Sequence, residues 1–166
     1  SVGSYPVETV QTMARIVEST ERRGIKQISK IKWDPHTTGG VVAMCAAQAA
    51  EQIEAKFMVA FTQSGDTARR LSRLRNRIPL IAITPDEQTS HWLTLCWGAQ
   101  VFQSPDFATN EEMVTHANKM LQEQLGGEEG QYSVIVFGSP IGVAGKTNTM
   151  RVHKLRDKNW KEGGKE

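Results

Sequence analysis

Apolar residues recur at two different periods along this chain, and the changes of period mark its elements. From Pro6 to Arg23 the apolar positions 7, 10, 13, 14 and 17 have helical spacing, and proline is well tolerated in a first helical turn. Gly24 is a typical residue for the end of that helix. A second helix is expected in the alanine-rich stretch that runs to residue 56, with Thr37 or Thr38 as its N-cap.

From residue 57 onward, short apolar runs alternate with amphipathic segments. The apolar runs predict strands at 57–61, 79–83, 99–103 and 133–137, and the segments between them predict helices at about 66–76, 86–97 and 110–125. Gly98 and Gly126 follow the last two of these helices, where a C-terminal cap is expected. Such an alternation indicates a parallel sheet with helices on both of its faces.

A final strand is expected at 148–153. It follows the preceding strand after a connection that is too short for a parallel crossover, so we expect it to be antiparallel. The predicted fold class is therefore α/β, a three-layer αβα sandwich with a five-stranded, mostly parallel sheet whose last strand is antiparallel. Residues 24–36 lack a sustained period and are expected to be a linker, residues 37–155 to be the α/β domain, and residues 156–166 to be a charged tail.

Composition places the chain among ordinary globular domains. It has 166 residues, of which 39% are hydrophobic and 23% charged, and a net charge of +2. Its longest apolar run, 41–47, is far below the roughly 20 residues of a membrane span. We expect a cytoplasmic location and no membrane partner, and the two cysteines, Cys45 and Cys96, fit buried thiols in a reduced compartment.

Five arginines gather in "ARRLSRLRNR", residues 68–77. On a helix they would form a solvated face opposite an apolar stripe, and attraction of phosphate is the alternative. Because no aromatic residue is interleaved with them, we do not expect a nucleic-acid partner.

The stretch "GSPIGVAGKTNT", residues 138–149, ends like a nucleotide-binding P-loop. That loop needs a glycine at the position of Pro140, because its backbone amides must curl around a phosphate, and it must continue as a helix. The residues after Lys146 instead alternate like a strand. The sequence therefore argues against a P-loop here.

A different phosphate site is predicted at "TQSGDTAR", residues 62–69, where a strand passes into the arginine-bearing helix. Free amides and a partial positive charge at a helix N-terminus attract anions. The candidate binding residues are Thr62, Gln63, Ser64, Gly65, Asp66 and Thr67. The alternative is ordinary N-capping by Ser64 or Thr67, and the carboxylate of Asp66 weakly favours it.

The glycine-rich loop is the second candidate. Three glycines and a lysine would let it lie over a ligand as a lid, and a plain hairpin-like connection is the alternative. The proposed lid residues are Ser139, Pro140, Gly142, Gly145, Lys146 and Thr147. The four histidines have no metal-binding spacing, and no nucleophile elbow occurs, so no catalytic or metal-binding residue is predicted.

Four motifs, in this order and spacing, resemble the C-terminal regulatory domain of pyruvate kinase preceded by the last helix of its catalytic barrel. They are "GSYPVETV" (3–10), "TQSGDTARRLSRLR" (62–75), "PLIAITPDEQTSHWLTLCWG" (79–98) and "GSPIGVAGKTNTMRVH" (138–153). Residues 1–23 match that barrel helix. The resemblance covers residues 3–153 and leaves only the charged tail unmatched.

The resemblance implies a parent enzyme that transfers phosphate from phosphoenolpyruvate to ADP in glycolysis, with magnesium and usually potassium. The catalytic barrel lies outside this chain, so we expect the chain to hold no cofactor and to be inactive by itself. It also implies a phosphorylated effector in the pocket between residues 62–67 and 139–147, contact with the barrel, and assembly into a homodimer or homotetramer.

Departures from the family restrict the effector. Gln63 replaces a lysine of the forms that fructose bisphosphate activates, and residues 103–112 contain neither the tryptophan nor the arginine that those forms use on a second phosphate. A sugar or nucleoside monophosphate is therefore expected. The alternatives are an oligomerisation or interaction domain without a ligand, and an independent phosphate-binding protein or phosphotransferase.

Overall fold

The computed structural model describes residues 2–24, 35–143, 145–157 and 159–160. The chain forms two compact units, Ser1–Lys32 and Trp33–Glu166. The first unit contains α1 (Pro6–Gly24), none of whose residues is buried. The expected linker lies mostly outside the described residues, as does most of the charged tail.

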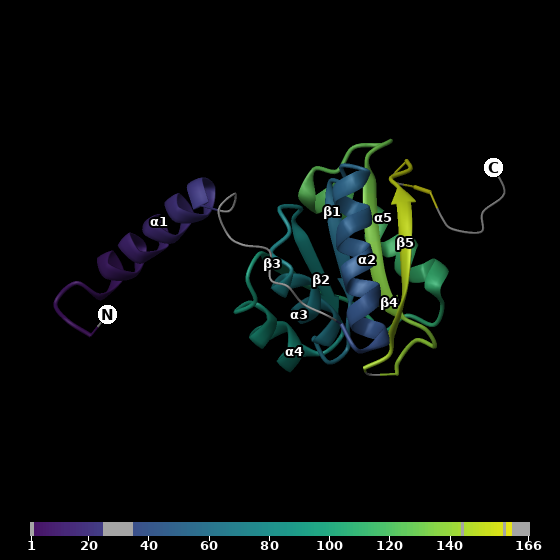
Figure 1. Cartoon of the computed structure of the whole chain (residues 1–166), viewed down its shortest axis with the longest axis horizontal. Coiled ribbons are helices and arrows are strands. Elements are labelled where there is room, and N and C mark those ends of the chain that lie inside the picture. Colours follow the sequence, from purple (N-terminus) through teal and green to yellow (C-terminus); the bar gives the residue numbers. More distant parts are fainter. Residues whose placement is uncertain (1, 25–34, 144, 158, 161–166) are drawn as a thin grey trace. The chain divides into compact units, whose positions relative to one another are not determined.

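The second unit is built on one five-stranded sheet, which Figure 1 shows with its helices. The strands are β1 (Phe57–Phe61), β2 (Leu80–Thr84), β3 (Ala99–Gln103), β4 (Tyr132–Gly138) and β5 (Thr147–Lys154), and their order across the sheet is β3-β2-β1-β4-β5. All neighbouring pairs are parallel except β4 and β5, which are antiparallel. The predicted fold class is confirmed, including the direction of the last strand.

Two apolar clusters, one on each face of the sheet, hold the helices. The helices α2 (Thr38–Gln52), α3 (Asp66–Arg73) and α4 (Glu87–Leu93) lie on one face, where small residues such as Ala43, Ala46 and Ala68 let them approach closely. The helix α5 (Asn110–Leu125) covers the other face with larger side chains, among them Met113 and Leu121. The three layers of the predicted sandwich follow from this division.

Three helices end earlier than their apolar periodicity suggested. The helix α3 stops at Arg73 rather than near residue 76, and Arg75 has φ +50°. The helix α2 stops at Gln52, shortly before Glu54, which has φ +51°. The helix α4 stops at Leu93, and a turn leads from there to β3. A residue in the left-handed region ends the helical hydrogen-bond ladder whatever the side-chain pattern beyond it.

The strand order reverses between β1 and β4. From β1 the chain moves through α3, β2 and α4 to β3 on one side, and then crosses by α5 to β4 on the other side of β1. The connection that leaves β1 runs through α3 on one face of the sheet, whereas the connection that leaves β3 runs through α5 on the other face. Such a switch point opens a crevice in which α/β proteins commonly bind ligands.

Among the described residues, no helix combines the length and the hydropathy that crossing a lipid bilayer would require.

Candidate functional site

The entrance of α3, directly after β1, has no side-chain cap. Its N-cap residue is Gly65, which has φ 78° and ψ −6° and makes no side-chain cap hydrogen bond. The alternative prediction of ordinary capping by Ser64 or Thr67 is therefore wrong. The first-turn amides and the positive end of the helix dipole are left available to another acceptor.

Packing by α4 explains why the residue at this turn is glycine. A Cβ atom added to Gly65 would lie 2.1 Å from Cζ2 of Trp92, and its φ is unfavourable for any other L-residue. Thr89, also on α4, donates its hydroxyl to the carbonyl oxygen of Gln63 at 3.0 Å. The shape of the 62–67 turn is thus set by a neighbouring helix, on the side away from the pocket lining.

Thr62, a largely buried residue, lines a pocket at this entrance. The residue is 8% exposed, and its backbone amide donates to the carbonyl oxygen of Ile83 at 3.0 Å. Its hydroxyl makes no hydrogen bond to another residue within the described ranges. A hydroxyl that lines a pocket and has no protein partner is available to a ligand or to water.

Asp66, in the first turn of α3, is neutralised by two arginines. Arg69 binds one carboxylate oxygen at 2.8 Å, and Arg70 binds the other at 2.7 Å. Partial burial acts to raise the pKa of Asp66, but the hydrogen bonds and charges of Arg69 and Arg70 outweigh it and hold this pKa below its ordinary value. The repulsion that Asp66 would exert on an anion is thereby reduced.

The glycine-rich loop connects β4 to β5. The side chain of Asn148 holds the start of this loop by two hydrogen bonds to Ser139. It accepts from the backbone amide of Ser139 at 2.8 Å and donates to the carbonyl oxygen of the same residue. The Ser139–Pro140 peptide is cis, and Gly142 and Gly145 have φ of 80° and 76°. Because a strand follows Lys146, the segment is not a P-loop.

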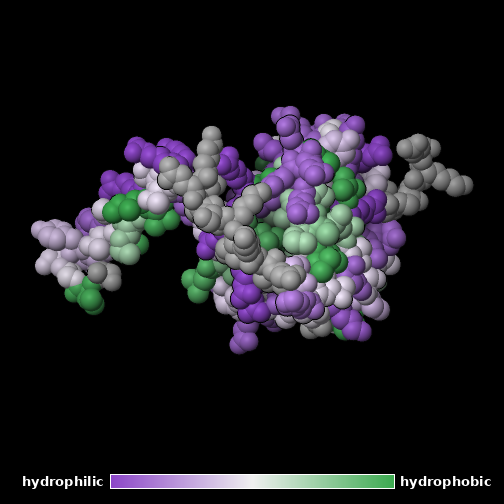
Figure 2. Space-filling view, in the orientation of Figure 1, coloured by the Kyte–Doolittle hydropathy of each residue, from purple (hydrophilic) through white to green (hydrophobic). Residues whose placement is uncertain are grey.

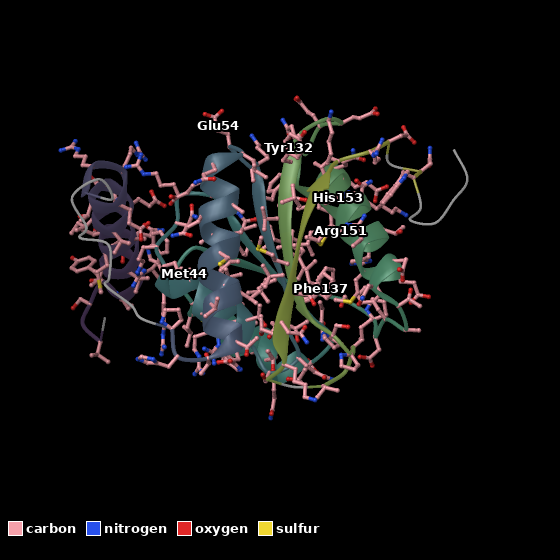
Figure 3. The ribbon with its side chains drawn as sticks, turned by 45° about the vertical axis from the view of Figure 1, so that its right-hand side comes forward. Met44, Glu54, Tyr132, Phe137, Arg151 and His153 are labelled. Atoms are coloured by element: carbon pink, nitrogen blue, oxygen red, sulfur yellow. The ribbon has the colours of Figure 1, made fainter. Side chains whose placement is uncertain are left out.

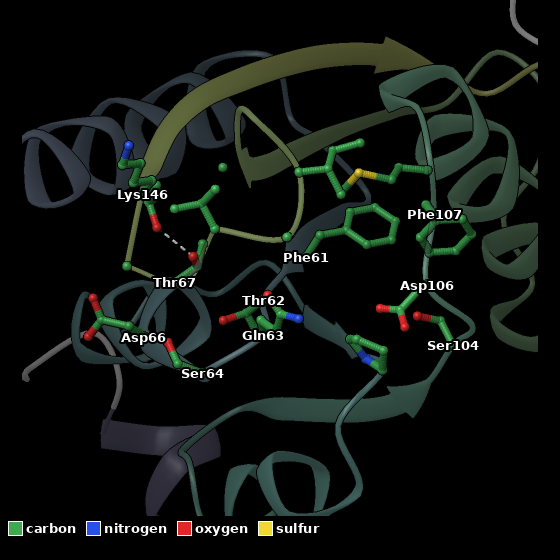
Figure 4. Close-up of a pocket in the computed structure, with 18 of the residues that line it drawn as sticks. Phe61, Thr62, Gln63, Ser64, Asp66, Thr67, Ser104, Asp106, Phe107 and Lys146 are labelled. Carbon is green, nitrogen blue, oxygen red and sulfur yellow. Dashed lines mark hydrogen bonds between the residues drawn. The ribbon is translucent and has the colours of Figure 1, made fainter.

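One hydrogen bond joins the two predicted segments directly. The hydroxyls of Thr67 and Thr147 lie 2.6 Å apart, and both residues are 5% exposed. Figure 4 shows the segments on either side of this bond, with Lys146 above the α3 entrance. The bond connects the first turn of α3 to the first residue of β5.

A pocket lies between the two segments, at the switch point of the sheet. Its volume is about 90 Å³, several times the roughly 10–15 Å³ that one water needs. Of the predicted residues, nine line it: Thr62, Gln63, Ser64, Asp66, Thr67, Gly142, Gly145, Lys146 and Thr147. Gly65, Ser139 and Pro140 belong to the same segments but are not among the lining residues.

The opposite end of the pocket comes from residues that the sequence did not identify. They are Phe61, Pro85, Ser104, Pro105, Asp106, Phe107 and Met113, while Ile141 and Val143 of the glycine-rich loop also line the pocket. Figure 4 shows Ser104, Asp106 and Phe107 at the far side from Lys146. The available signal was positional, because residues 104–107 follow the carboxyl end of a predicted parallel strand.

The side chains at this far end are mainly apolar. The rings of Phe61 and Phe107 make an edge-to-face contact with centroids 5.7 Å apart. Behind them, His116 of α5 packs against Phe107 at 5.1 Å, and burial, followed by the charge of Lys119, lowers the pKa of His116. The pocket therefore has a polar end, with Thr62, Ser64, Thr67 and Lys146, and an aromatic end that carries one carboxylate, Asp106.

No other chemistry gathers at the site. Within the described ranges, no three His, Cys, Asp or Glu side chains are grouped so as to hold a metal ion. Both cysteines are free thiols. The residues present thus offer binding groups for an anion and for an apolar body.

The switch-point pocket and the mainly parallel sheet define an α/β domain of the class that carries ligand sites at its strand ends. A sequence model described as "Pyruvate kinase, alpha/beta domain" matches residues 41–153. The chain belongs to this pyruvate kinase C-terminal domain family.

Pyruvate kinases from several bacteria are similar to the chain over almost its whole length. The enzyme of Corynebacterium glutamicum is 39% identical over 157 residues, which cover 95% of this chain and 33% of that protein. The enzyme of Mycobacterium tuberculosis is 37% identical over 155 residues, with 93% and 33% covered. The chain therefore spans about a third of the length of these relatives.

The fold is also that of a solved pyruvate kinase. The crystal structure of the enzyme from Cryptosporidium parvum matches with a TM-score of 0.78 at 22% identity, covering 93% of this chain and 31% of the other. At that identity the match supports the fold.

Proposed function

We propose that this chain is the regulatory domain of a pyruvate kinase and that its switch-point pocket binds a phosphorylated small molecule. In this proposal, the parent enzyme converts phosphoenolpyruvate and ADP to pyruvate and ATP in the cytoplasm. Magnesium and potassium act in the barrel, since the described part of this chain offers no metal-binding group. The chain by itself is inactive, and α1 packs against that barrel through Val7, Val10, Met13 and Val17, all more than half exposed.

The observation that carries the binding proposal is Thr62, a residue only 8% exposed that lines the pocket and whose hydroxyl has no partner within the described ranges. It lies beside the uncapped first turn of α3 and below Lys146. A phosphate oxygen would accept from the hydroxyl, from the first-turn amides and from the lysine. In the part of the chain that the structure describes, no carboxylate bonds the Thr62 hydroxyl or Lys146.

The far end of the pocket supports a single phosphate per ligand. Asp106 lines it and would repel a second phosphate, whereas Phe61 and Phe107 would contact a sugar face or a base. A hexose, pentose or nucleoside monophosphate therefore fits better than a bisphosphate.

Replacing Thr62 by valine tests the site. Because the hydroxyl has no protein partner, the folded protein should lose no stability, and its midpoint of urea unfolding should stay or rise. Affinity for ribose 5-phosphate, glucose 6-phosphate or AMP, measured by titration calorimetry, should fall by about 10-fold or more, since a hydrogen bond to a charged group contributes roughly 1.5–3 kcal/mol. Unchanged affinity would refute the assignment of Thr62.

Thr84 provides the matched control. It ends the neighbouring strand β2, is 0% exposed, and accepts from the amide of Asp86 at 3.2 Å, yet it does not line the pocket. Thr84→Val should therefore lose stability and keep its affinity for the same ligands. The two threonines are expected to give opposite patterns.

A second proposed role is assembly of subunits. The side chains of the edge strand β5 alternate between the two faces of the sheet. On one face, His153 bonds Asn118 of α5. On the face that α2 covers lie Met150 and Val152, whose exposed fractions are 39% and 46%. Figure 2 shows apolar surface over α2, and Figure 3 shows Met44 on that helix and Tyr132, Arg151 and His153 along the adjoining strands. An unpaired edge beside an apolar face suits a homodimer or homotetramer.

Light scattering on the full chain tests this second role. If the β5 edge mediates assembly, Val152→Lys should convert an oligomer to a smaller species. Leu95→Lys, at an 88% exposed residue before β3, the opposite edge strand, should not. A monomeric wild type would contradict the role of this face. Assembly without any ligand binding would favour the alternative function, an oligomerisation domain with an empty pocket.

A further inference from the structure

Behind the anion end of the pocket, Arg70 joins the first turns of two helices. Its Nε donates to Oδ2 of Asp66 at 2.7 Å, and its Nη1 donates to the hydroxyl of Thr37 at 3.1 Å. The side chain of Arg70 is 24% exposed, against 53% for Arg69, which binds the other oxygen of Asp66. Arg70 is therefore the inner of the two arginines and the one that reaches a second element.

Thr37 is the N-cap of α2, and its hydroxyl also accepts from the amide of Gly40 at 3.2 Å. The first turn of α2 packs closely against Thr147, which lines the pocket, and against Arg70. A Cβ atom added to Gly39 would lie 3.3 Å from Cβ of Thr147 and 3.6 Å from Nε of Arg70. Thr147 in turn bonds the hydroxyl of Thr67. The starts of α2, α3 and β5 thus meet at one place.

An anion at the α3 entrance would add a second negative group to the acceptors that compete for the Arg70 guanidinium. Asp66 and a bound phosphate both attract the guanidinium, whereas Thr37 offers it a neutral hydroxyl at a longer distance. Binding therefore pulls Arg70 toward the entrance and weakens its bond to the cap of α2. The chain reaches that cap directly after the boundary between its two compact units.

We propose that Arg70 couples occupancy of the anion site to the first turn of α2, where the α/β unit joins the segment that leads from α1. This inference rests on the proposed function and adds the route by which a bound ligand is sensed. Arg70 acts through Asp66 and Thr37 and does not line the pocket. Because coupling is reciprocal, changes at Thr37 must alter the affinity for the anion.

Arg70→Lys separates coupling from simple neutralisation of charge. A lysine keeps a positive charge beside Asp66 but lacks the fork that reaches two acceptors at once. In the full chain, this variant should still bind ribose 5-phosphate, with a change in affinity of the same sign as in Thr37→Val, because both variants remove the Arg70–Thr37 bond. Binding should speed amide hydrogen exchange at residues 38–41 in wild type, and this response should disappear in the variant.

Two cap variants complete the experiment. Thr37→Val removes the acceptor of Arg70 and should change ribose 5-phosphate affinity by about threefold or more, whereas Thr37→Ser should restore it. Thr109 is the matched control, because its hydroxyl caps α5 and accepts from the amide of Glu112 at 3.2 Å, the distance at which Thr37 accepts from Gly40. It does not bond Arg70, so Thr109→Val should leave the affinity for ribose 5-phosphate unchanged. Inorganic phosphate is the second probe.

The outcomes distinguish the two proposals. If wild type binds ribose 5-phosphate but residues 38–41 do not respond, or if they respond equally in Arg70→Lys, the coupling is refuted and the pocket stands. If wild type binds neither ribose 5-phosphate nor inorganic phosphate, the proposed function fails and the coupling falls with it.

Discussion

Segments 62–67 and 138–147 line the same pocket, but the protein holds them by different means. The first is fixed along its length, by Trp92 packed on Gly65, by Thr89 bonded to Gln63 and by the arginines on Asp66. The second is tied near its ends, through Asn148 and Thr147, with Ile141 packed against the core on the α5 side.

Because the two segments are held differently, substitutions in them should have different effects on the free energy of unfolding and on ligand affinity. Substitutions that remove the contacts holding segment 62–67, at Gly65 or Asp66, should affect folding and ligand affinity together, because the same contacts set both. Thr62 is the exception, since its hydroxyl has no protein partner within the described ranges and should affect affinity alone. Substitutions on the exposed part of the glycine-rich loop should affect affinity with little effect on folding.

Gly65→Ala should have the largest effect. The added methyl group would collide with Trp92 and would occupy a left-handed conformation, so we expect a loss of about 3 kcal/mol or more in unfolding free energy. Gly98→Ala is the control, since Gly98 has φ 69° but nothing within 4 Å of the added Cβ, and it should lose only about 1–2 kcal/mol. Equal losses in urea unfolding would contradict the role given to Trp92.

The bond between Thr67 and Thr147 should come next. Valine at either position leaves one buried hydroxyl without its partner, which costs about 1–3 kcal/mol. The double variant should lose less than the sum of the single losses, with a coupling on the order of 1 kcal/mol in a double-mutant cycle. Strict additivity would show that the two segments fold independently.

Lys146→Met should change affinity alone. The lysine is exposed, so the unfolding free energy should stay within about 0.5 kcal/mol of wild type. Affinity for ribose 5-phosphate should fall roughly 5- to 30-fold, by the loss of one charged donor. Lys56→Met, at the amino end of β1, removes the same charge far from the strand ends that form the pocket and should leave affinity unchanged.

The smallest effect concerns pH. His116 has a lowered pKa in the folded protein, so the unfolded chain binds its proton first as pH falls below the ordinary value of 6.5. Stability from this group is therefore present above pH 6.5 and is lost as pH falls from there toward the lower folded pKa. We expect this loss, measured as the pH dependence of the urea-unfolding midpoint, to be absent in His116→Gln. An identical pH profile in the variant would assign the loss to other groups.

Much of the fold was predictable because its signals are local. The run at 57–61 is uniformly apolar, and the observed strand is buried along its whole length. Thr37 caps α2, and Gly126 ends α5 in the left-handed conformation, as their residue types indicate. The short connection to residue 148 correctly gave an antiparallel last strand.

The candidate site was predictable only in part. Residues 62–67 and 139–147 were chosen from glycines, hydroxyls and family motifs, and most of them line one pocket. The far wall at Ser104–Phe107 was missed, since nothing in that segment by itself indicates a ligand. Capping by Ser64 or Thr67 was wrong because Trp92, 27 residues beyond Gly65, selects the turn.

The sequence by itself determined the elements, their order and the two segments rich in anion-binding groups, because periodicity, caps and turn residues act over a few neighbours. The tertiary structure alone decided that β1 and β4 lie side by side, and so that residues 80 positions apart share a hydrogen bond. It also decided that Arg70 reaches Thr37. Such contacts depend on how strands pair across the whole sheet, and no local pattern encodes that pairing.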